Sequence, residues 1–431
     1  SGSVVASRLS ENENWSVLLL EAGGQETVET EVPLLMHNLH GTKVDWNYTT
    51  VPQKYACGAN GGVGMCYWPR GQILGGSSTT NAMVYMRGNR KDYDNWAAMG
   101  IEGWSYEEVL PYFLRSEDQK NSKYAANKKY HSTGGYLTVS ESRYQSPLIR
   151  DYMNLGRRLG YLEQDANAEN QTAFMPLQGT FRDGARCSTA KAFLRPARNW
   201  SNLHVVTGAF VTKIVVDKES MTATGVEFLK DGEKITVKAN VQMDLISPQT
   251  ISTGETNTWA FFGLILRPKT RGTIMLRSSD PKVHPAIDPK YFAEPEDRRL
   301  IKEAARMATE FGASEEMNRI KSEFDFKYYE ACHYLGDKLS DAYLDCLVHN
   351  YTFTDFHPTG TCRMGAVTDP RTVVDPKLRV LGINGLRVID ASVMPDVPSG
   401  NTNAPTIMVA EKGSDIIKEH WATTTKMEIL V

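Results

Sequence analysis

The sequence predicts an α/β fold with room for two to three domains. A glycine-containing turn at the start leads into a helix and then a short apolar strand, and a second apolar strand at 386–389 ends in an acid. Open α/β sheets place their ligands at strand ends of this kind. At roughly 150 residues per domain, a chain of 431 residues allows two to three domains.

The composition excludes several classes of protein. Hydrophobic residues make up 41% and charged residues 23%, which argues against global disorder. Lys and Arg number 48 and Asp and Glu 51, a net charge of −3, so the basic excess of a nucleic-acid-binding protein is absent. No apolar run approaches the ~18 residues that span a bilayer. We therefore expect neither nucleic acid nor a membrane span.

The first element is a helix, in which Val4, Val5 and Leu9 recur at helical spacing. The strand Trp15–Leu20 follows and ends at Glu21. A dinucleotide fingerprint has three glycines that open a helix and an acid ~20 positions later. Gly2 would be its third glycine, so the first strand and two glycines would lie upstream of residue 1. The alternative is an ordinary βαβ crossover without a ligand.

The second motif is "PRGQILGGSSTTNAMVYMRGN" at 69–89. Glycines let a backbone approach a ligand closely, and successive N–H groups form an anion-binding nest. The run Gly75, Gly76, Ser77 and Ser78 suits a pyrophosphate, with Arg70 and Arg87 able to add charge-assisted bonds. Asn81, beside apolar Ala82, Met83 and Val84, suits a flat polar heterocycle. The alternative is an irregular Gly/Ser loop.

The C-terminal third carries further candidates. His357 lies in the turn-rich segment "YTFTDFHPTGTC", where it is either structural or catalytic. The strand Leu386–Ile389 ends at Asp390, and the small residue Ala391 follows. A last helix begins near Pro405, and its partly positive start favours an anion. The alternative is a core helix with an ordinary Asn-rich cap.

The six cysteines include two local pairs, Cys57 with Cys66 and Cys332 with Cys346. Such pairs suggest disulfides and an oxidising compartment, whereas the alternative is six buried free thiols. Five Asn-x-Ser/Thr sequons also fit secretion. They begin at Asn14, Asn47, Asn170, Asn199 and Asn350. We expect an extracellular, secreted protein, whose signal peptide would lie upstream of residue 1.

Four segments together resemble the glucose–methanol–choline (GMC) oxidoreductase family, and most closely its insect, glucose dehydrogenase-like branch. They are "SGSVVASRLSENENWSVLLLEAGG" at 1–24, the motif at 69–89, "RCSTAKAFLRPARNWSNLHVVTGAFVTKIVV" at 186–216 and the block from "HPTGTCRMG" to "GNTNAPTIMVAEK" at 357–412. The resemblance covers nearly the whole chain except about 240–260.

The resemblance implies a flavoenzyme. Its fold would be a Rossmann-like FAD-binding domain interleaved with an α+β substrate-binding domain built on an antiparallel sheet. It would oxidise the CH–OH group of an alcohol or sugar by hydride transfer to the flavin, with quinone or oxygen as electron acceptor. His357 matches the catalytic histidine, which can accept the hydroxyl proton. Asn401 matches the second active-site position.

The resemblance also assigns the cofactor contacts. Gly2 matches the last glycine of the phosphate turn, Glu21 the acid that holds the ribose, and Val211 the residue whose backbone meets adenine. The expected FAD-binding residues are Gly2, Glu21, Ala22, Arg70, Gly75, Gly76, Ser78, Asn81, Ala82, Met83, Val84, Val211, Asp390, Ala391 and Thr402. Some relatives link FAD through a histidine where this chain has Thr80, so we expect FAD to be non-covalent. We expect no metal ligands.

The resemblance divides the chain into segments. Residues 1–255 form an N-terminal, FAD-binding segment in which 96–180 partly belongs to the substrate domain. Residues 260–364 bind substrate and 365–431 return to the FAD domain, the C-terminal family segment being about 265–418. Within the substrate part, 288–311 predicts a loop and then a helix that packs on the substrate sheet, with Leu300, Ala304 and Met307 inward.

The resemblance has two gaps. Compared with the family pattern, the chain looks truncated at its N-terminus, which would cost the parallel sheet a central strand, and a block near 240–260 looks deleted. The alternative function is therefore a non-catalytic, truncated remnant of the family without bound flavin.

Overall fold

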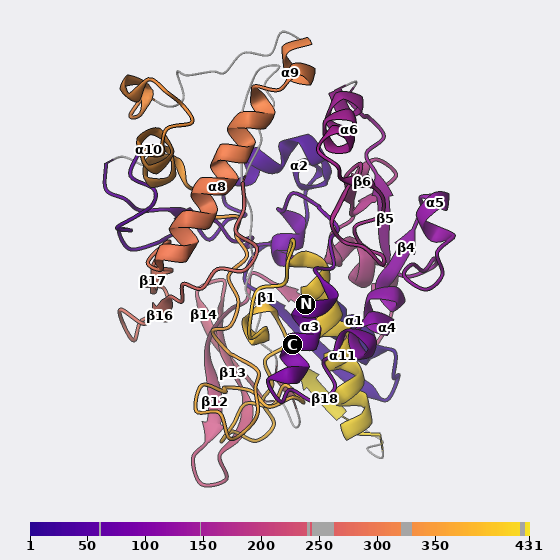
Figure 1. Cartoon of the computed structure of the whole chain (residues 1–431). Helices are drawn as coiled ribbons and strands as arrows, with labels where there is room; N and C mark the ends of the chain where they lie inside the picture. Colours follow the sequence, from indigo (N-terminus) through magenta and orange to yellow (C-terminus); the bar gives the residue numbers. More distant parts are fainter. Residues whose placement is uncertain (60–61, 147, 239–241, 244–262, 320–329, 423–426) are drawn as a thin grey trace.

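The computed structural model describes all residues except 60–61, 147, 239–241, 244–262, 320–329 and 423–426. Figure 1 shows both chain ends near the centre of the molecule, beside the helices α1 (Gly2–Ser10) and α11 (Asn403–His420). The long helix α8 (Pro295–Gly312) lies at the opposite end of the molecule from the β12–β13 hairpin. The segment 245–254, which carries the expected internal deletion, lies outside the described residues.

A parallel sheet lies at the centre of the fold. In the described part of the chain its strand order is β11-β1-β18-β15, and each neighbouring pair is parallel. The strands are β1 (Trp15–Glu21), β11 (Leu203–Thr207), β15 (Gln242–Met243) and β18 (Met427–Leu430). The predicted helix and the strand that ends at Glu21 are therefore confirmed.

The strand β18 fills the place beside β1. Its register runs from Trp15 opposite Met427 to Leu18 opposite Leu430, and Ile429 is 2% exposed. The Val431 N–H donates to the Leu18 carbonyl at 2.7 Å. The sheet is therefore not short of a central strand, and the expectation that it would be was wrong. Sequence order could not reveal this, because the strand comes from the far end of the chain.

A buried ion pair joins the first and last helices. The Arg8 guanidinium donates two hydrogen bonds of 2.8 Å to the Glu411 carboxylate. The Glu411 side chain is fully buried, so the pair relies on this two-point geometry to offset desolvation. Helix α11 also packs on α4 (Tyr106–Ser116). The pair fixes α1 and α11, which pack directly on each other.

The remaining elements surround this centre. The described residues form two three-stranded sheets. The first is antiparallel and consists of β12 (Phe210–Asp217), β13 (Thr222–Lys230) and β14 (Glu233–Lys238). The second is mixed and consists of β4 (Glu117–Gln119), β5 (Leu137–Glu141) and β8 (Gln178–Gly179). Two-stranded ladders pair β2 (Tyr48–Thr49) with β3 (Tyr67–Trp68), β6 (Leu162–Glu163) with β7 (Ala173–Phe174), β9 (Phe181–Arg182) with β10 (Ala185–Arg186), and β16 (Thr273–Met275) with β17 (Ala286–Asp288). In the part of the chain that the structure describes, the other α-helices are α2 (Val28–Glu31), α3 (Arg90–Ala98), α5 (Ser122–Ala125), α6 (Leu148–Arg158), α7 (Arg195–Ala197), α9 (Glu315–Arg319) and α10 (Asp341–Tyr351).

Two sequence expectations need correction. Leu386–Ile389 is largely buried but forms no strand of the sheet, because this stretch pairs only through isolated bridges such as Arg379 with Arg387. Met307 is 44% exposed rather than inward, because α8 packs on α10 and turns other residues toward it.

The cysteine prediction is confirmed. Disulfides join Cys57 to Cys66 and Cys332 to Cys346, and Cys187 and Cys362 are free. Within the described ranges, no helix has the length and apolar character to cross a membrane. The same residues contain no group of three or more His, Cys, Asp or Glu side chains placed to hold a metal ion.

The position of β18 predicts a stability cost for Ile429→Ala. Truncating a fully buried aliphatic side chain removes transfer energy and leaves a cavity, so the free energy of unfolding should fall by about 2–5 kcal/mol. Leu276→Ala, which truncates an aliphatic side chain that is 86% exposed, should change it by less than about 0.5 kcal/mol. Urea unfolding measures both variants. Equal stability of the two would contradict the docking of β18.

Candidate functional site

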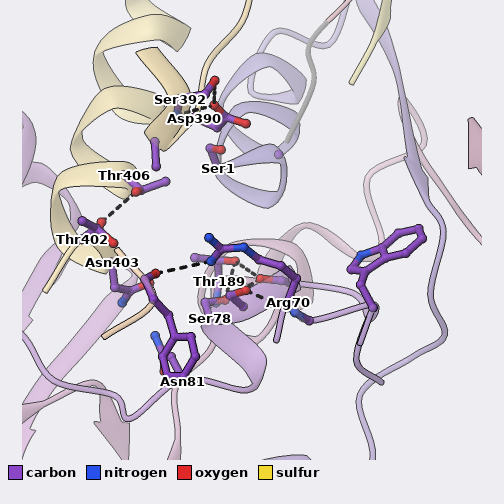
Figure 2. A pocket seen from close by; sticks show the side chains of 18 of the residues that line it. Ser1, Arg70, Ser78, Asn81, Thr189, Asp390, Ser392, Thr402, Asn403 and Thr406 are labelled. Carbon is purple, nitrogen blue, oxygen red and sulfur yellow. Dashed lines mark hydrogen bonds between the residues drawn. The ribbon is translucent and has the colours of Figure 1, made fainter. Parts of the chain in front are cut away.

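One cavity of about 590 Å³ brings distant parts of the sequence together. Arg87, which the sequence also offered as a partner for a pyrophosphate, does not line this cavity, because it is fully buried elsewhere and pairs with Glu117 at 2.9 Å. The other residues expected to bind FAD or to act in catalysis all lie in the cavity wall. These are Gly2, Glu21, Ala22, Arg70, Gly75, Gly76, Ser78, Asn81, Ala82, Met83, Val84, Val211, His357, Asp390, Ala391, Asn401 and Thr402. Figure 2 shows side chains from several of these segments turned toward a common space.

The carboxyl end of β1 forms one end of the cavity. Glu21 terminates this strand, and its carboxylate accepts the Gly23 N–H at 2.7 Å. Burial raises the pKa of Glu21 to about 7, and the Gly23 bond works in the opposite direction. Helix α1 starts at Gly2 beside it, so the partly positive end of that helix faces the cavity. This end therefore offers an acceptor for hydroxyl groups next to a site for an anion.

The glycine loop is packed so closely that side chains do not fit. A Cβ at Gly71 would lie 2.6 Å from the Gly76 carbonyl oxygen. Gly75 has φ +88°, and a Cβ there would lie 2.5 Å from the Thr79 hydroxyl and 3.1 Å from the Ala190 Cβ. The loop therefore needs glycine for space at both positions and for backbone conformation at Gly75.

A hydroxyl pair holds this loop from the other side of the sequence. The Ser78 hydroxyl donates to the Gly75 carbonyl at 2.7 Å and lies 2.9 Å from the Thr189 hydroxyl. The Thr189 N–H also donates to Ser78 at 2.9 Å. Figure 2 shows the two residues side by side. The loop's shape thus depends on a residue more than a hundred positions away.

Arg186 fixes the next stretch of the cavity wall. The Asn81 side-chain oxygen accepts the Met83 N–H and an Arg186 N–H, both at 2.9 Å. Arg186 also donates to the Asn81 carbonyl at 2.6 Å. Burial lowers the pKa of Arg186 to about 9, although the Glu26 charge opposes this. Together these bonds set the direction of Asn81–Val84.

Arg70 connects the glycine motif to the histidine segment. Its side chain is 7% exposed and donates to the Phe356 carbonyl at 3.3 Å. Burial lowers the pKa of Arg70 to about 9, against the opposing charges of nearby Tyr and Asp groups. The segment that precedes His357 is thereby attached to the cavity wall.

His357 and Asn401 face each other in the cavity. The Asn401 side-chain nitrogen lies 3.4 Å from His357 Nε2, and His357 Nδ1 lies 3.0 Å from an Asp355 carboxylate oxygen. An amide nitrogen only donates, and a carboxylate only accepts. This pattern assigns the ring proton to Nδ1 and leaves a lone pair on Nε2. The histidine can therefore accept a proton from a hydroxyl group at this point.

The remaining wall comes from the C-terminal segments. The Asp390 carboxylate accepts the Ser392 N–H at 2.8 Å and so begins the 3-10 turn Ala391–Val393. Helix α11 begins at Asn403, immediately after Thr402. Thr406 donates to the Thr402 carbonyl at 2.7 Å, as Figure 2 shows. A helix start thus faces the cavity on this side as well.

Sequence reasoning missed several wall residues. They include Trp46, Tyr48, Trp68, Thr189, Phe210, Asp355, Ser392 and Asn403. Trp46 and Tyr48 stack with their rings 6.0 Å apart, and Tyr48 pairs with Trp68 in the β2–β3 ladder. The closely spaced aromatic residues in "DWNYTT" were a signal for this wall. Thr189 had no signal of its own, because its role depends on a distant contact.

Comparisons with known proteins agree with this arrangement. Two family models described as GMC oxidoreductase match residues 18–254 and 268–410. The chain is 34% identical to glucose dehydrogenase [FAD, quinone] of Drosophila pseudoobscura pseudoobscura, over 98% of this chain and 85% of the relative. It is 30% identical to the mitochondrial choline dehydrogenase of Mus musculus, over 99% and 89%. The first alignment runs over 537 positions, so the relative carries internal residues that have no counterpart among the 431 here.

The solved structures that resemble the chain include pyridoxine 4-oxidase from Mesorbium loti. The TM-score is 0.84 at 23% identity, and the match covers 97% of both chains. At this identity the likeness establishes the fold, which is the α/β class predicted from the sequence.

The crowding at Gly75 predicts that Gly75→Ala destabilises the chain more than Gly232→Ala does. The two glycines have similar backbone conformations, with φ +88° at Gly75 and φ +85° at Gly232. An added Cβ at Gly232, however, meets no atom within 4 Å. The control should lose about 1–2 kcal/mol for the left-handed conformation alone. Gly75→Ala should lose about 1–3 kcal/mol more from overpacking. Urea unfolding measures the difference, and equal losses would contradict the close packing of the loop.

Proposed function

This chain belongs to the GMC oxidoreductase family and is an FAD-dependent oxidoreductase of CH–OH donors, and we propose that it oxidises an alcohol or sugar with His357 as the proton acceptor. The observation that supports the assignment most is the pair His357 and Asn401, whose facing nitrogens lie 3.4 Å apart in the same cavity as the glycine loop and Glu21. One cavity thus combines dinucleotide-binding features with a base.

The cavity wall fits FAD. The glycine loop has room for a closely approaching ligand but none for side chains, since Cβ atoms at Gly71 and Gly75 would clash. Such loops suit the pyrophosphate of a dinucleotide. Glu21 would hold the ribose hydroxyls, and Asn81–Val84 would face the flavin ring. The buried charge of Arg70 in the wall would complement the negative charge of the cofactor.

Bound FAD supplies the hydride acceptor, and the chain's own residues manage the proton. We assign removal of the substrate hydroxyl proton to the His357 Nε2 lone pair. The Asn401 side-chain nitrogen would donate a hydrogen bond to the same substrate oxygen and so orient it. The electron acceptor that we propose is a quinone or oxygen, and the proposed location is extracellular.

Two further assignments belong to the same proposal. Thr80, 1% exposed, stands where some relatives carry a linking histidine, so FAD would be held without a covalent bond. Residues 1–95, 180–255 and 365–431 would form the FAD-binding part, and residues 96–180 and 260–364 would form the substrate-binding part.

The non-covalent attachment of FAD predicts that acid denaturation releases free flavin from the purified protein. Flavin retained on the denatured chain would contradict it.

The role of His357 predicts the behaviour of His357→Ala. The wild-type protein should be yellow and should lose its flavin absorbance when an alcohol or sugar is added without oxygen. His357→Ala should keep the colour but lose absorbance about a hundredfold or more slowly, since general-base catalysis contributes about that much. His333→Ala is the matched control, because His333 is exposed on a short helical turn and bonds a backbone carbonyl.

Two outcomes would contradict this proposal. A colourless protein that ignores added FAD would instead support a non-catalytic remnant. Equal rates of flavin reduction in His357→Ala and the wild type would exclude His357 as the base.

The raised pKa of Glu21 predicts that FAD affinity depends on pH. Below about pH 7 the carboxyl group of the empty site is mostly protonated, whereas ribose hydroxyls that donate to it favour the ionised form. Binding therefore releases a proton, and affinity should rise as pH approaches 7 and level off above it. Glu21→Gln cannot ionise and should bind more weakly with little pH dependence. Titration of the apo-protein followed by flavin fluorescence measures this, and an unchanged pH dependence in the variant would contradict the role of Glu21.

A further inference from the structure

Asp355 contacts the proposed base, but the function proposed above gives it no role in the reaction. Its carboxylate oxygen is 3.0 Å from His357 Nδ1, on the ring edge opposite Asn401. The Asp355 side chain is 36% exposed and that of His357 20% exposed, and both residues line the cavity. The contact is therefore made at the cavity wall and is not an ion pair of the outer surface.

The backbone between the two residues is held in place. Phe356 has φ +58°, an unfavourable conformation for an aromatic residue, and is only 6% exposed. Its N–H donates to the Thr354 hydroxyl at 3.0 Å, and its carbonyl accepts from Arg70. A strained residue persists only where its surroundings fix it, and such residues cluster at functional sites. The 355–357 turn is thus a fixed feature that brings the carboxylate to the imidazole.

We propose that Asp355 is a positioning residue for His357, an inference that rests on the proposed function. Its carboxylate accepts a hydrogen bond from the Nδ1–H group and so fixes both the tautomer and the ring orientation. Nε2 is then left without a proton and aimed at Asn401 and the substrate hydroxyl. When Nε2 takes a proton, the carboxylate also stabilises the positive imidazolium.

Charge near the imidazole decides how large this effect is. Among the described residues that line the cavity, the other ionisable side chains are Glu21, Tyr48, Arg70 and Asp390. Arg70 donates a hydrogen bond to the carbonyl of Phe356, which lies between Asp355 and His357. Burial raises the pKa of Tyr291, and the nearby Asp355 charge acts in the same direction. Asp355 alone of the carboxylates bonds the ring, but its partial exposure screens the charge. We therefore expect a moderate effect on rate, smaller than loss of the base itself.

The test compares Asp355→Asn, Asp355→Ala and Asp355→Glu in the flavin-loaded protein. Flavin reduction by a saturating alcohol is followed in the absence of oxygen across a range of pH. Asp355→Asn and Asp355→Ala should reduce the flavin about tenfold more slowly near neutral pH, a part of what a general base contributes. Flavin absorbance and the apparent substrate Kd should change less than about twofold, because the substrate's contacts remain. Asp355→Glu restores the charge and should recover much of the rate.

Rescue by the conservative variant separates positioning from a structural role. Asp355→Asn keeps the size of the side chain but loses the charged acceptor, whereas Asp355→Glu keeps that acceptor, so only the second should recover the rate. Asp369→Asn is the matched control, since Asp369 also bonds a side chain two residues later, that of Arg371, but does not line the cavity. This control should keep the rate of the wild type.

The outcomes are distinguishable from failure of the proposed function. If the wild type is reduced and His357→Ala is not, but Asp355→Asn and Asp355→Ala keep the wild-type rate, the positioning role is overturned. A rate loss in Asp355→Asn without recovery in Asp355→Glu would also overturn it. If the wild type is not reduced, or His357→Ala is as fast, the proposed function itself has failed.

Discussion

Parallel pairing of β1 with β11 on one side and β18 on the other is the constraint on which the site depends. Because the pairs are parallel, their carboxyl ends open toward the same cavity, which receives Glu21 from β1 and Leu430 from β18. The segment that follows β11 brings Val211 to the same wall. Helix α1 begins there as well and is tied to α11 by the Arg8–Glu411 pair. This end of the cavity is thus set by backbone hydrogen bonds and one buried ion pair.

The opposite wall depends on side-chain bonds between distant segments. Thr189 holds the glycine loop through Ser78, Arg186 holds Asn81, and Arg70 holds the Phe356 carbonyl. These three contacts hold backbone segments that contain positive φ angles, at Gly75, Met83 and Phe356. His357 consequently faces Asn401. The glycine-loop wall and the His357–Asn401 pair are therefore held by separate sets of bonds, so substitutions can separate the proposed cofactor binding from the proposed proton transfer.

Much of the site could be predicted because its signals are local. The glycines at 75 and 76, the acid at 21 and His357 each stand in short motifs, and the disulfide partners are close in sequence. Features that depend on long-range contacts could not be predicted. Thr189 contacts Ser78, and β18 pairs with β1, across long separations in the sequence. Residues 386–389 form isolated bridges, whereas their apolar pattern predicts a strand. Met307 was placed inward because helical spacing does not reveal which partner a helix meets.

We propose that one cavity binds FAD and that a hydride and a proton leave a CH–OH group there. Rapid mixing of the oxidised protein with an alcohol, and with the same alcohol deuterated at the carbinol carbon, would test both transfers. Absorbance of the bound flavin should disappear, and deuteration should slow its loss, because the bond to that hydrogen breaks in the step observed. A flavin that is not reduced, or is reduced equally fast with both alcohols when chemistry limits the rate, would disprove this proposal.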